Sequence, residues 1–392
     1  MENPNFDHVI DRIGTGSAKW DALSSIYNLD PTDSIPMWVA DMEFQPPKAV
    51  RTALEGMNEH GVFGYYGDQT AYKASITGWM ARRHGWTVDP DWIFTTHGLV
   101  NGTSLCMQAY TQPGDGVILF TPVYHVFSKL IHAANRRLVE SPLVNTNGRY
   151  RMDLEALEAS LTGDEKMIIF CSPHNPCGRV WTREELEAVC AFCLKHNLIL
   201  VSDEIHHDLV YPGNNHTIMA NVTPDITSRL VMMTAATKTF NMAGGHSGNV
   251  IIEDETLRAT FGAKMAELGI SPNSFGVAMT EAAYTHGDAW LDQLIDYLDG
   301  NRKLFDAGVN AIPGLSSMPL EATYLAWVDF SGTGMSREEF TDRVQNKARI
   351  ATNYGPTFGK GGESFLRFNF ACPRSVVEDA VGRLAEAFSD LQ

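Results

Sequence analysis

What the 392-residue sequence lacks argues against three classes of protein: membrane-spanning, secreted and nucleic-acid-binding. No apolar run approaches the roughly 18 residues that a membrane-spanning helix needs. The opening stretch MENPNFDHVIDRIGTG is polar and lacks the basic-then-apolar order of a secretory signal. Basic residues are scarce, since 30 lysines and arginines face 47 aspartates and glutamates, for a formal net charge of −17. Phosphate backbones and anionic membranes require cationic counter-charge, so we expect no nucleic-acid or membrane partner.

Cysteine is also sparse, with six residues scattered along a long chain. This usage fits reduced thiols and a cytoplasmic location better than a disulfide framework. Cys190 and Cys193 form a C-x-x-C motif, but they lie inside the helical pattern EELEAVCAFCLKHN with no second pair nearby. We expect no metal site and no redox role there.

Short apolar runs alternate with amphipathic stretches between about residues 92 and 255. Strand–helix alternation of this kind predicts an α/β fold with a mainly parallel sheet covered on both faces. Thr182 and Glu185 form a capping box that predicts the start of one helix. The predicted strands are WIFTTHG (92–98), GVILFTP (116–122), MIIFCSP (167–173), LILVSDE (198–204), RLVMMTA (229–235) and GNVIIE (248–253).

The pattern changes after about residue 285. A helical run over 288–307 precedes the strand candidate LEATYLAWVDF, a further helix and the strand candidate FLRFNFA. The order predicts a smaller α+β domain. We expect residues 1–45 to form an N-terminal segment that packs with it, residues 46–285 a large domain, and residues 286–392 the small domain.

Four predicted strands end in residues that could carry chemistry: Gly98, Asn175, Asp203 and Lys238. Ligands of open α/β sheets bind beyond the carboxyl ends of strands, which is where these residues fall. Each has an ordinary alternative, because Asn175 could be a turn residue, Asp203 a helix cap and Lys238 a solvated lysine. A lysine among small and apolar neighbours has a lowered pKa, however, and becomes a candidate nucleophile.

The combination of these four positions is more specific than any one of them. The helix start after Gly98 can bind an anion, although it is neither a P-loop nor a G-x-G-x-x-G turn. A phosphate site, a carboxylate, a hydrogen-bond donor and a lysine are what pyridoxal 5′-phosphate (PLP) requires. The carboxylate keeps the pyridine nitrogen protonated, the donor holds the ring oxygen, and the lysine supplies the imine.

The chain resembles the fold-type I PLP enzymes of the class I/II aminotransferase group, and within it the MalY/PatB-type cystathionine β-lyases (C–S lyases). This resemblance implies a mainly parallel, seven-stranded-type sheet in a large domain, plus a smaller α+β domain. It spans nearly the whole chain and is carried by KWD (19–21), MWVADMEF (37–44), FGYY (63–66), SPHNPCGRVWTREEL (172–186), VSDEIHHDLV (201–210), TKTFNMAG (237–244), EATYLAWVDF (321–330) and FLRFNFACPRS (365–375).

The resemblance implies a set of cofactor-binding residues. Lys238 is the catalytic, imine-forming lysine, and Asp203 pairs with the pyridinium nitrogen. Asn175 donates to the ring oxygen with support from His206, and Tyr124 stacks on the ring. Core packing of Tyr124 and a structural role of His206 are the alternatives. The phosphate contacts are the backbone of Gly98, Leu99 and Val100, and Tyr65 of a neighbouring subunit, which implies a homodimer.

Two positions depart from the pattern of many relatives. Ala235 stands where a phosphate-binding serine is common, and His246 stands where aminotransferases often carry an arginine. Thr237 and His246 are the candidates to replace those phosphate contacts. We expect His207, beside His206, to be a surface residue.

A further set of residues is implied to bind the substrate. Arg367 binds the α-carboxylate, since a guanidinium can grip it in bidentate fashion, with an ordinary ion pair as the alternative. Backbone at Ala40 and Asp41 assists it. Tyr324, together with Trp20, Tyr65 and the loop over 355–363, lines the end of the site that receives the group on sulfur. This glycine-rich loop is either a mobile lid or a plain turn.

The implied reaction is β-elimination from L-cystathionine or another cysteine S-conjugate, a small amino acid, which gives a thiol, pyruvate and ammonia. The alternative enzyme is a class I/II aminotransferase that uses the same residues. A third possibility is a regulatory protein that has kept the fold without turnover. Retention of Lys238, Asp203, Asn175 and Arg367 argues against it, because an inactive site need hold none of them.

Overall fold

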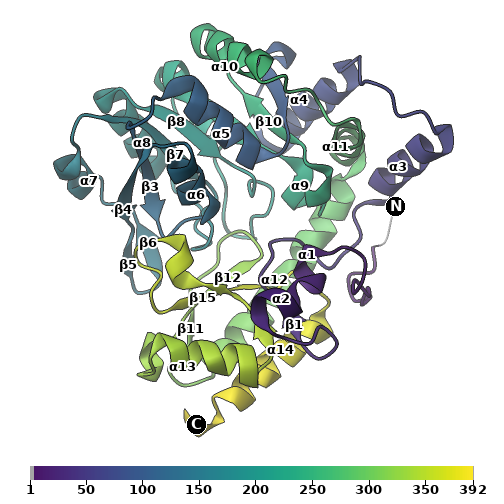
Figure 1. Cartoon of the computed structure of the whole chain (residues 1–392), viewed down its shortest axis with the longest axis vertical. Helices are drawn as coiled ribbons and strands as arrows, with labels where there is room; N and C mark the ends of the chain where they lie inside the picture. The colour runs from purple at the N-terminus through teal and green to yellow at the C-terminus, as the bar shows by residue number, and fades with distance from the viewer. Residues whose placement is uncertain (1–3, 392) are drawn as a thin grey trace.

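A seven-stranded sheet is the largest in the computed structural model, which describes residues 4–391 (Figure 1). Residues 1–3 and 392, at the outer ends of the predicted domains, lie outside the described residues. The strand order is β2-β10-β9-β8-β7-β3-β4, and only β10 runs antiparallel to its neighbours. The strands are β2 (Ile93–Thr96), β3 (Gly116–Thr121), β4 (Arg137–Pro142), β7 (Glu165–Cys171), β8 (Ile199–Asp203), β9 (Leu230–Thr234) and β10 (Gly248–Ile251). The prediction of a mainly parallel, seven-stranded sheet is confirmed.

Six of these strands coincide with the apolar runs of the sequence, whereas β4 was not predicted. β4 lies at the edge of the sheet, pairs only with β3 among the described strands, and is half-exposed along most of its length. An edge strand of this kind carries charged residues, here Arg137 and Glu140, and so shows no continuous apolar run.

Both faces of the sheet are buried. In β3, Val117 and Leu119 belong to one hydrophobic cluster with α5, α6 and α10, while Ile118 and Phe120 belong to another that includes α4 and α8. Neighbouring side chains of a strand point to opposite faces, so burial on both sides yields continuous apolar runs instead of alternation. The helices of this part are α3 (Lys48–His60), α4 (Thr70–His84), α5 (Leu99–Tyr110), α6 (Val126–Ala133), α7 (Leu154–Ser160), α8 (Arg183–His196), α9 (Ala236–Thr239), α10 (Glu255–Glu267) and α11 (Ser274–His286).

Two helix starts follow directly from local sequence. The predicted capping box at α8 is confirmed, since Thr182 Oγ1 accepts from the Glu185 N–H at 3.3 Å and the Glu185 carboxylate accepts from the Thr182 N–H at 2.8 Å. At α5 the turn from β2 requires Gly98, whose φ of 81° is costly for a residue with a side chain.

A four-stranded sheet in the order β11-β12-β15-β14 forms the lower part of the molecule in Figure 1. The N-terminal elements lie beside this part, because β1 pairs in parallel with β13. The domain boundaries at residues 45 and 285 stay a prediction. The elements are α1 (Ala18–Asp21), α2 (Leu23–Tyr27), β1 (Ile35–Pro36), the hairpin β5 (Val144–Thr146) and β6 (Arg149–Arg151), α12 (Asp288–Asn310), β11 (Ser316–Ser317), β12 (Leu325–Asp329), α13 (Arg337–Asp342), β13 (Ile350–Ala351), β14 (Asn353–Tyr354), β15 (Phe365–Asn369) and α14 (Arg374–Ala387).

None of the helices between residues 4 and 391 combines the length and the apolar character that crossing a membrane requires.

Candidate functional site

A cavity of about 260 Å³ lies at the carboxyl ends of β2, β7, β8 and β9. These four strands run in the same direction, because β10 is antiparallel to both β2 and β9. The residues that follow them therefore meet at one edge of the sheet. The predicted residues that line the cavity are Ala40, Gly98, Leu99, Val100, Tyr124, Asn175, Asp203, His206, Thr237, Lys238 and His246.

Lys238 lies in α9, the single helical turn that follows β9. Its Nζ donates to the backbone carbonyl of Ala40 at 2.5 Å. Desolvation lowers the pKa of the amine to about 8, and the charge of Arg367 acts in the same direction, whereas Asp41 and Asp203 oppose the shift. An amine with this pKa is partly neutral near pH 7 and is available as a nucleophile or base.

Asp203 is the last residue of β8 and its carboxylate is buried at the base of the cavity. Burial raises its pKa to about 7, Glu204 adds to the increase, and the N–H of Ile205, 3.1 Å from Oδ1, opposes it. Few neighbouring groups offset the cost of burying the negative charge of Asp203. The carboxylate therefore favours a cationic partner in the cavity.

Arg367 extends from β15 to the side of Asn175, behind the cavity wall. Its Nη1 donates to Asn175 Oδ1 at 3.1 Å, and its Nη2 donates to the carbonyl of Trp38 at 3.0 Å and to Asn353 Oδ1 at 2.5 Å. Nε of the same guanidinium has no hydrogen-bond partner among the described residues. Burial lowers the pKa of Arg367 to about 10. All three acceptors are neutral groups. Among the described residues Arg367 therefore does not form the ordinary ion pair that was the alternative.

Three further side chains lie near Lys238, and of these His206 and Tyr124 line the cavity whereas Tyr324 does not. His206 is buried, its ring lies 6.1 Å from that of Tyr324, and its Nδ1 has no partner among the described residues. Tyr324 donates to the carbonyl of Ala40 at 3.0 Å, the same oxygen that Lys238 contacts. Tyr124 is half-buried and borders the cavity, so its ring is not enclosed in the core on all sides.

The helix start at Gly98 lies at another side of the cavity. The first N–H groups of an α-helix have no acceptor within the helix, and those of Leu99 and Val100 point toward an anion if one is present. A Cβ at Gly98 would meet no heavy atom within 4 Å, so the backbone here is open to a ligand. Thr237 and His246 line the same cavity, whereas Ala235 offers no side-chain donor.

Sequence reasoning missed five residues of the cavity wall: His97, Phe127, Cys171, Ile205 and Ala243. His97 and Ile205 adjoin predicted residues in the chain, and Cys171 is the last residue of β7. Their position at strand ends is a signal that could have identified them. Phe127 and Ala243 carry no such signal, because only the packing of α6 and of the turn after α9 brings them to the cavity.

Some predicted residues lie outside the cavity. Tyr65 is fully exposed in the single chain. Asp41 directs its carboxylate away toward Arg12 at 2.9 Å and Lys19 at 3.3 Å. Trp20 donates to Glu43 Oε2 at 3.1 Å. Phe358, in the glycine-rich loop, is buried and lies 5.0 Å from the guanidinium of Arg367, which fixes the base of that loop beside the site.

The expectation that His207 is a surface residue is wrong. Only 1% of His207 is exposed, because the C-terminal end of α4 covers it and the ring of His84 packs against it at 4.6 Å. His206 and His207 are identical in type and adjacent in the chain, so the sequence offers no means to tell their surroundings apart.

Comparisons with known proteins agree with this geometry. The family description "Aminotransferase class I and II" matches residues 33–384. The chain is 39% identical to cystathionine beta-lyase PatB of Bacillus subtilis over 98% of this chain and 100% of the relative. It is 31% identical to protein MalY of Escherichia coli over 98% of each chain.

A solved structure extends the similarity to three dimensions. Cystalysin of Treponema denticola, which contains a pyridoxal 5′-phosphate cofactor, matches with a TM-score of 0.95 and 35% identity over 100% of both chains. The family match covers most of the sequence, and the fold and strand-end residues agree with it. The chain therefore belongs to the aminotransferase class I and II family and has its fold-type I architecture.

Proposed function

We propose that this protein is a PLP-dependent C–S lyase that cleaves L-cystathionine or a related L-cysteine S-conjugate into a thiol, pyruvate and ammonia. The observation that carries the proposal is the placement of Lys238 Nζ in one cavity with Asp203 and Asn175, beside Arg367. The similarity to a relative named cystathionine beta-lyase supports the lyase reaction over amino transfer.

The residues present fit PLP, as three features of the cavity indicate. The buried Asp203 carboxylate suits the ring nitrogen, because its charge is poorly compensated by its neighbours. Asn175 has its Oδ1 engaged by Arg367, which leaves its amide N–H groups as donors to the ring oxygen, and the unpartnered Nδ1 of His206 lies on the same side. The N–H groups of Gly98, Leu99 and Val100 suit the phosphate, with Thr237 and His246 as additional contacts and Tyr124 against the ring.

Bound PLP would supply an electron sink for negative charge that develops at the substrate α-carbon. Lys238, with its pKa of about 8, supplies the neutral amine that takes the α-proton. Asp203 keeps the proton on the ring nitrogen, because an ion pair with that nitrogen compensates the burial of its charge.

Substrate orientation falls to residues on the other side of Lys238. Arg367 binds the α-carboxylate through donors that now contact the neutral acceptors Asn353 and the Trp38 carbonyl. A charged carboxylate is a stronger acceptor than either, so exchange of partners is favourable. Ala40 and Asp41 supply backbone next to this position, and Tyr324 limits it on one side.

The decisive experiment gives the purified, PLP-loaded protein L-cystathionine with no 2-oxo acid, and couples pyruvate to lactate dehydrogenase. We expect steady pyruvate formation together with an equal amount of ammonia. Amino transfer to an added 2-oxo acid without pyruvate formation would instead identify an aminotransferase. A bound cofactor without either reaction would identify a protein that has kept the fold without turnover.

We also propose that the enzyme is a homodimer with shared active sites. Tyr65 is fully exposed and its neighbours Val62 and Phe63 are exposed as well, which is unusual for large apolar side chains that face water. Phe63 lies against the exposed Phe275 at 5.5 Å, so these side chains form a patch that a second chain could cover. Sedimentation should give twice the chain mass. The cytoplasmic location stays a prediction that rests on the six free thiols.

A further inference from the structure

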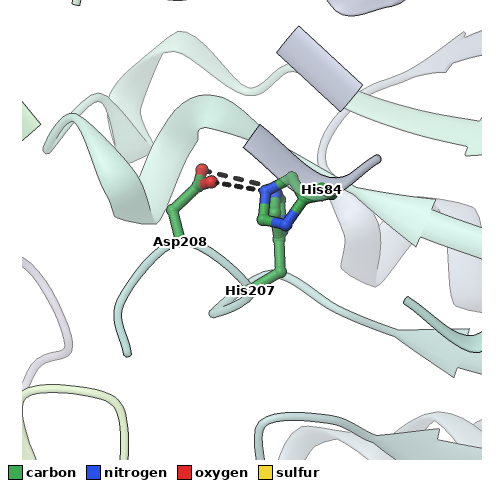
Figure 2. Close-up of side chains that lie close together, drawn as sticks. All are labelled: His84, His207 and Asp208. Carbon is green, nitrogen blue, oxygen red and sulfur yellow. Dashed lines mark hydrogen bonds and ion pairs between the residues drawn. The ribbon is translucent and has the colours of Figure 1, made fainter. Parts of the chain in front are cut away.

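A second group of chemically active side chains lies apart from the Lys238 cavity. His84 ends α4, and His207 and Asp208 follow β8 in the turn after Asp203 (Figure 2). One ligand-type atom from each of the three lies within 4.8 Å of the others. A separate cavity of about 350 Å³ borders all three residues and shares no lining residue with the Lys238 cavity. Two further titratable side chains of its wall are already paired, His216 with Glu204 at 2.7 Å and Asp292 with Arg83 at 2.9 Å.

The hydrogen bonds of His207 determine which of its ring nitrogens is free. Nδ1 contacts the backbone carbonyl of Glu204, and because a carbonyl can only accept, Nδ1 carries the hydrogen. In the neutral ring Nε2 then presents a lone pair. This atom has no hydrogen-bond partner among the described residues and lies 3.3 Å from Asp208 Oδ2. A lone pair and a carboxylate oxygen that face each other in a buried place repel, unless a proton on Nε2 or a metal cation lies between them.

Asp208 is held so that its charge stays in this position. Its Oδ1 accepts from the Trp79 indole at 3.0 Å, and its Oδ2 accepts from the Thr239 hydroxyl at 2.8 Å. Metal-binding carboxylates are typically oriented by such outer hydrogen bonds, and metal-binding histidines typically donate their second N–H to a backbone carbonyl. Asp208 shows the first of these arrangements and His207 shows the second.

We propose that His84 Nε2, His207 Nε2 and an Asp208 carboxylate oxygen bind one divalent transition-metal ion, with the adjoining cavity open to its fourth position. In a tetrahedral site with ligand bonds of 2.0–2.1 Å, ligand atoms lie about 3.3 Å apart. Asp208 Oδ2 lies at this spacing from His207 Nε2, at 3.3 Å, whereas Asp208 Oδ1 lies closer to His84 Nε2, at 2.8 Å, so the ion would engage the two histidines through different carboxylate oxygens or draw His84 outward by about 0.5 Å. Two imidazoles and one carboxylate select zinc, cobalt or nickel over calcium and magnesium, which prefer all-oxygen sites.

The ion would join the end of α4 to the turn that follows Asp203. This role is structural and does not depend on the reaction at Lys238, so the proposal is independent of the proposed lyase function. It also differs from a thiolate site at Cys190 and Cys193, because no sulfur atom belongs to the group.

The test uses tag-free, PLP-loaded protein that has been treated with a chelator and then dialysed against Co²⁺. We expect one cobalt per chain, a visible ligand-field spectrum typical of four-coordinate Co²⁺ without thiolate charge-transfer bands, and a raised Tm. His84→Gln and His207→Gln should each weaken cobalt binding by at least about tenfold. Matched controls are His132→Gln, which changes an exposed imidazole, and Cys190→Ser, and both should bind cobalt like the wild type.

Two results would overturn the proposal. One is the absence of stoichiometric cobalt from wild-type protein, which would identify a network held by hydrogen bonds alone. The other is unchanged cobalt binding in His84→Gln, which would place the metal elsewhere. His84 is half-buried and glutamine preserves its length and polarity, so this variant should fold even where changes at the buried His207 do not, and circular dichroism checks that it has.

Discussion

Lys19 and Lys238 are two lysines enclosed by the same fold, yet their surroundings set their charge in opposite ways. Lys19 is 1% exposed and pairs with Glu43 at 2.7 Å and Asp41 at 3.3 Å. Although burial works against it, these carboxylates raise the pKa of Lys19 above its usual value. Within the described part of the chain the amine of Lys238 has one hydrogen-bond partner, the backbone carbonyl of Ala40, and desolvation lowers its pKa to about 8.

The difference shows what separates a structural from a chemically active lysine. Paired carboxylates hold the charge of Lys19 and make it a brace for the N-terminal segment, together with Arg12. Lys238 has no ion-pair partner within 4.0 Å among residues 4–391, so little opposes the loss of its proton. The two sites meet at residues 40 and 41, where Ala40 contacts Lys238 and Asp41 contacts Lys19.

The substitution with the largest expected effect on activity is Lys238→Ala. Pyruvate formation from L-cystathionine should fall by at least about 10³-fold, because both the anchor of the cofactor and the proton-accepting amine are lost. Borohydride treatment followed by mass spectrometry should attach cofactor to the wild type and not to the variant. Lys166→Ala, at an exposed lysine, is the matched control and should keep full activity. Activity within tenfold of the wild type would assign the base to another residue.

Replacing each lysine with methionine should change the free energy of unfolding differently at the two positions. Lys19→Met should lower the free energy of unfolding by about 3 kcal/mol, because it leaves two carboxylates without their buried partner. Lys238→Met should not lower it and should raise it at pH 7, since it removes a cation that burial disfavours. Urea unfolding of the apoproteins measures both, with Lys166→Met as the surface control. Equal losses of stability at the two positions would contradict this difference between Lys19 and Lys238.

Arg367, like Lys238, is a buried cation without a carboxylate partner among the described residues. Arg367→Gln should lower kcat/KM for L-cystathionine by about 10²-fold, since the α-carboxylate loses its charged, buried partner. The loss should appear mainly in KM, with the absorbance of bound cofactor retained. Arg149→Gln, at an exposed surface pair, serves as control. An unchanged KM would show that another group binds the carboxylate.

The smallest expected effect is on the pH dependence of stability. Unfolded Lys238 titrates near 10.5 and folded Lys238 near 8, so between these values the unfolded chain binds more protons. The Lys238 contribution therefore makes apoprotein stability rise with pH in this window, by at most about 1.4 kcal/mol per pH unit. Lys19 has the opposite sign, because its raised pKa gives stability that is present below 10.5 and lost above its folded pKa. Lys238→Met should remove the rise between pH 8 and 10.5, and an identical profile would contradict the lowered pKa.

Much of the site was predictable because it depends on strand ends. Apolar runs located β7, β8 and β9, and parallel order brought the residues after them, Asn175, Asp203 and Lys238, to one edge of the sheet. What the sequence did not reveal depends on packing between distant elements. The hydrogen bond between Arg367 and Asn175 and the burial of His207 beneath α4 are examples, since neither leaves a local pattern.

The parallel pair of β1 and β13 has a consequence for the order in which the chain can mature. Ile35 pairs with Ile350, and the two are 350 − 35 = 315 residues apart. During synthesis residues 35 and 36 therefore leave the ribosome long before their partner strand. Parts of the chain that fold earlier must therefore do so while residues 35–41 still lack the strand that holds them in place. Because Ala40 belongs to this segment and contacts Lys238, a nascent chain lacks a finished cofactor pocket until residues 350 and 351 have been made.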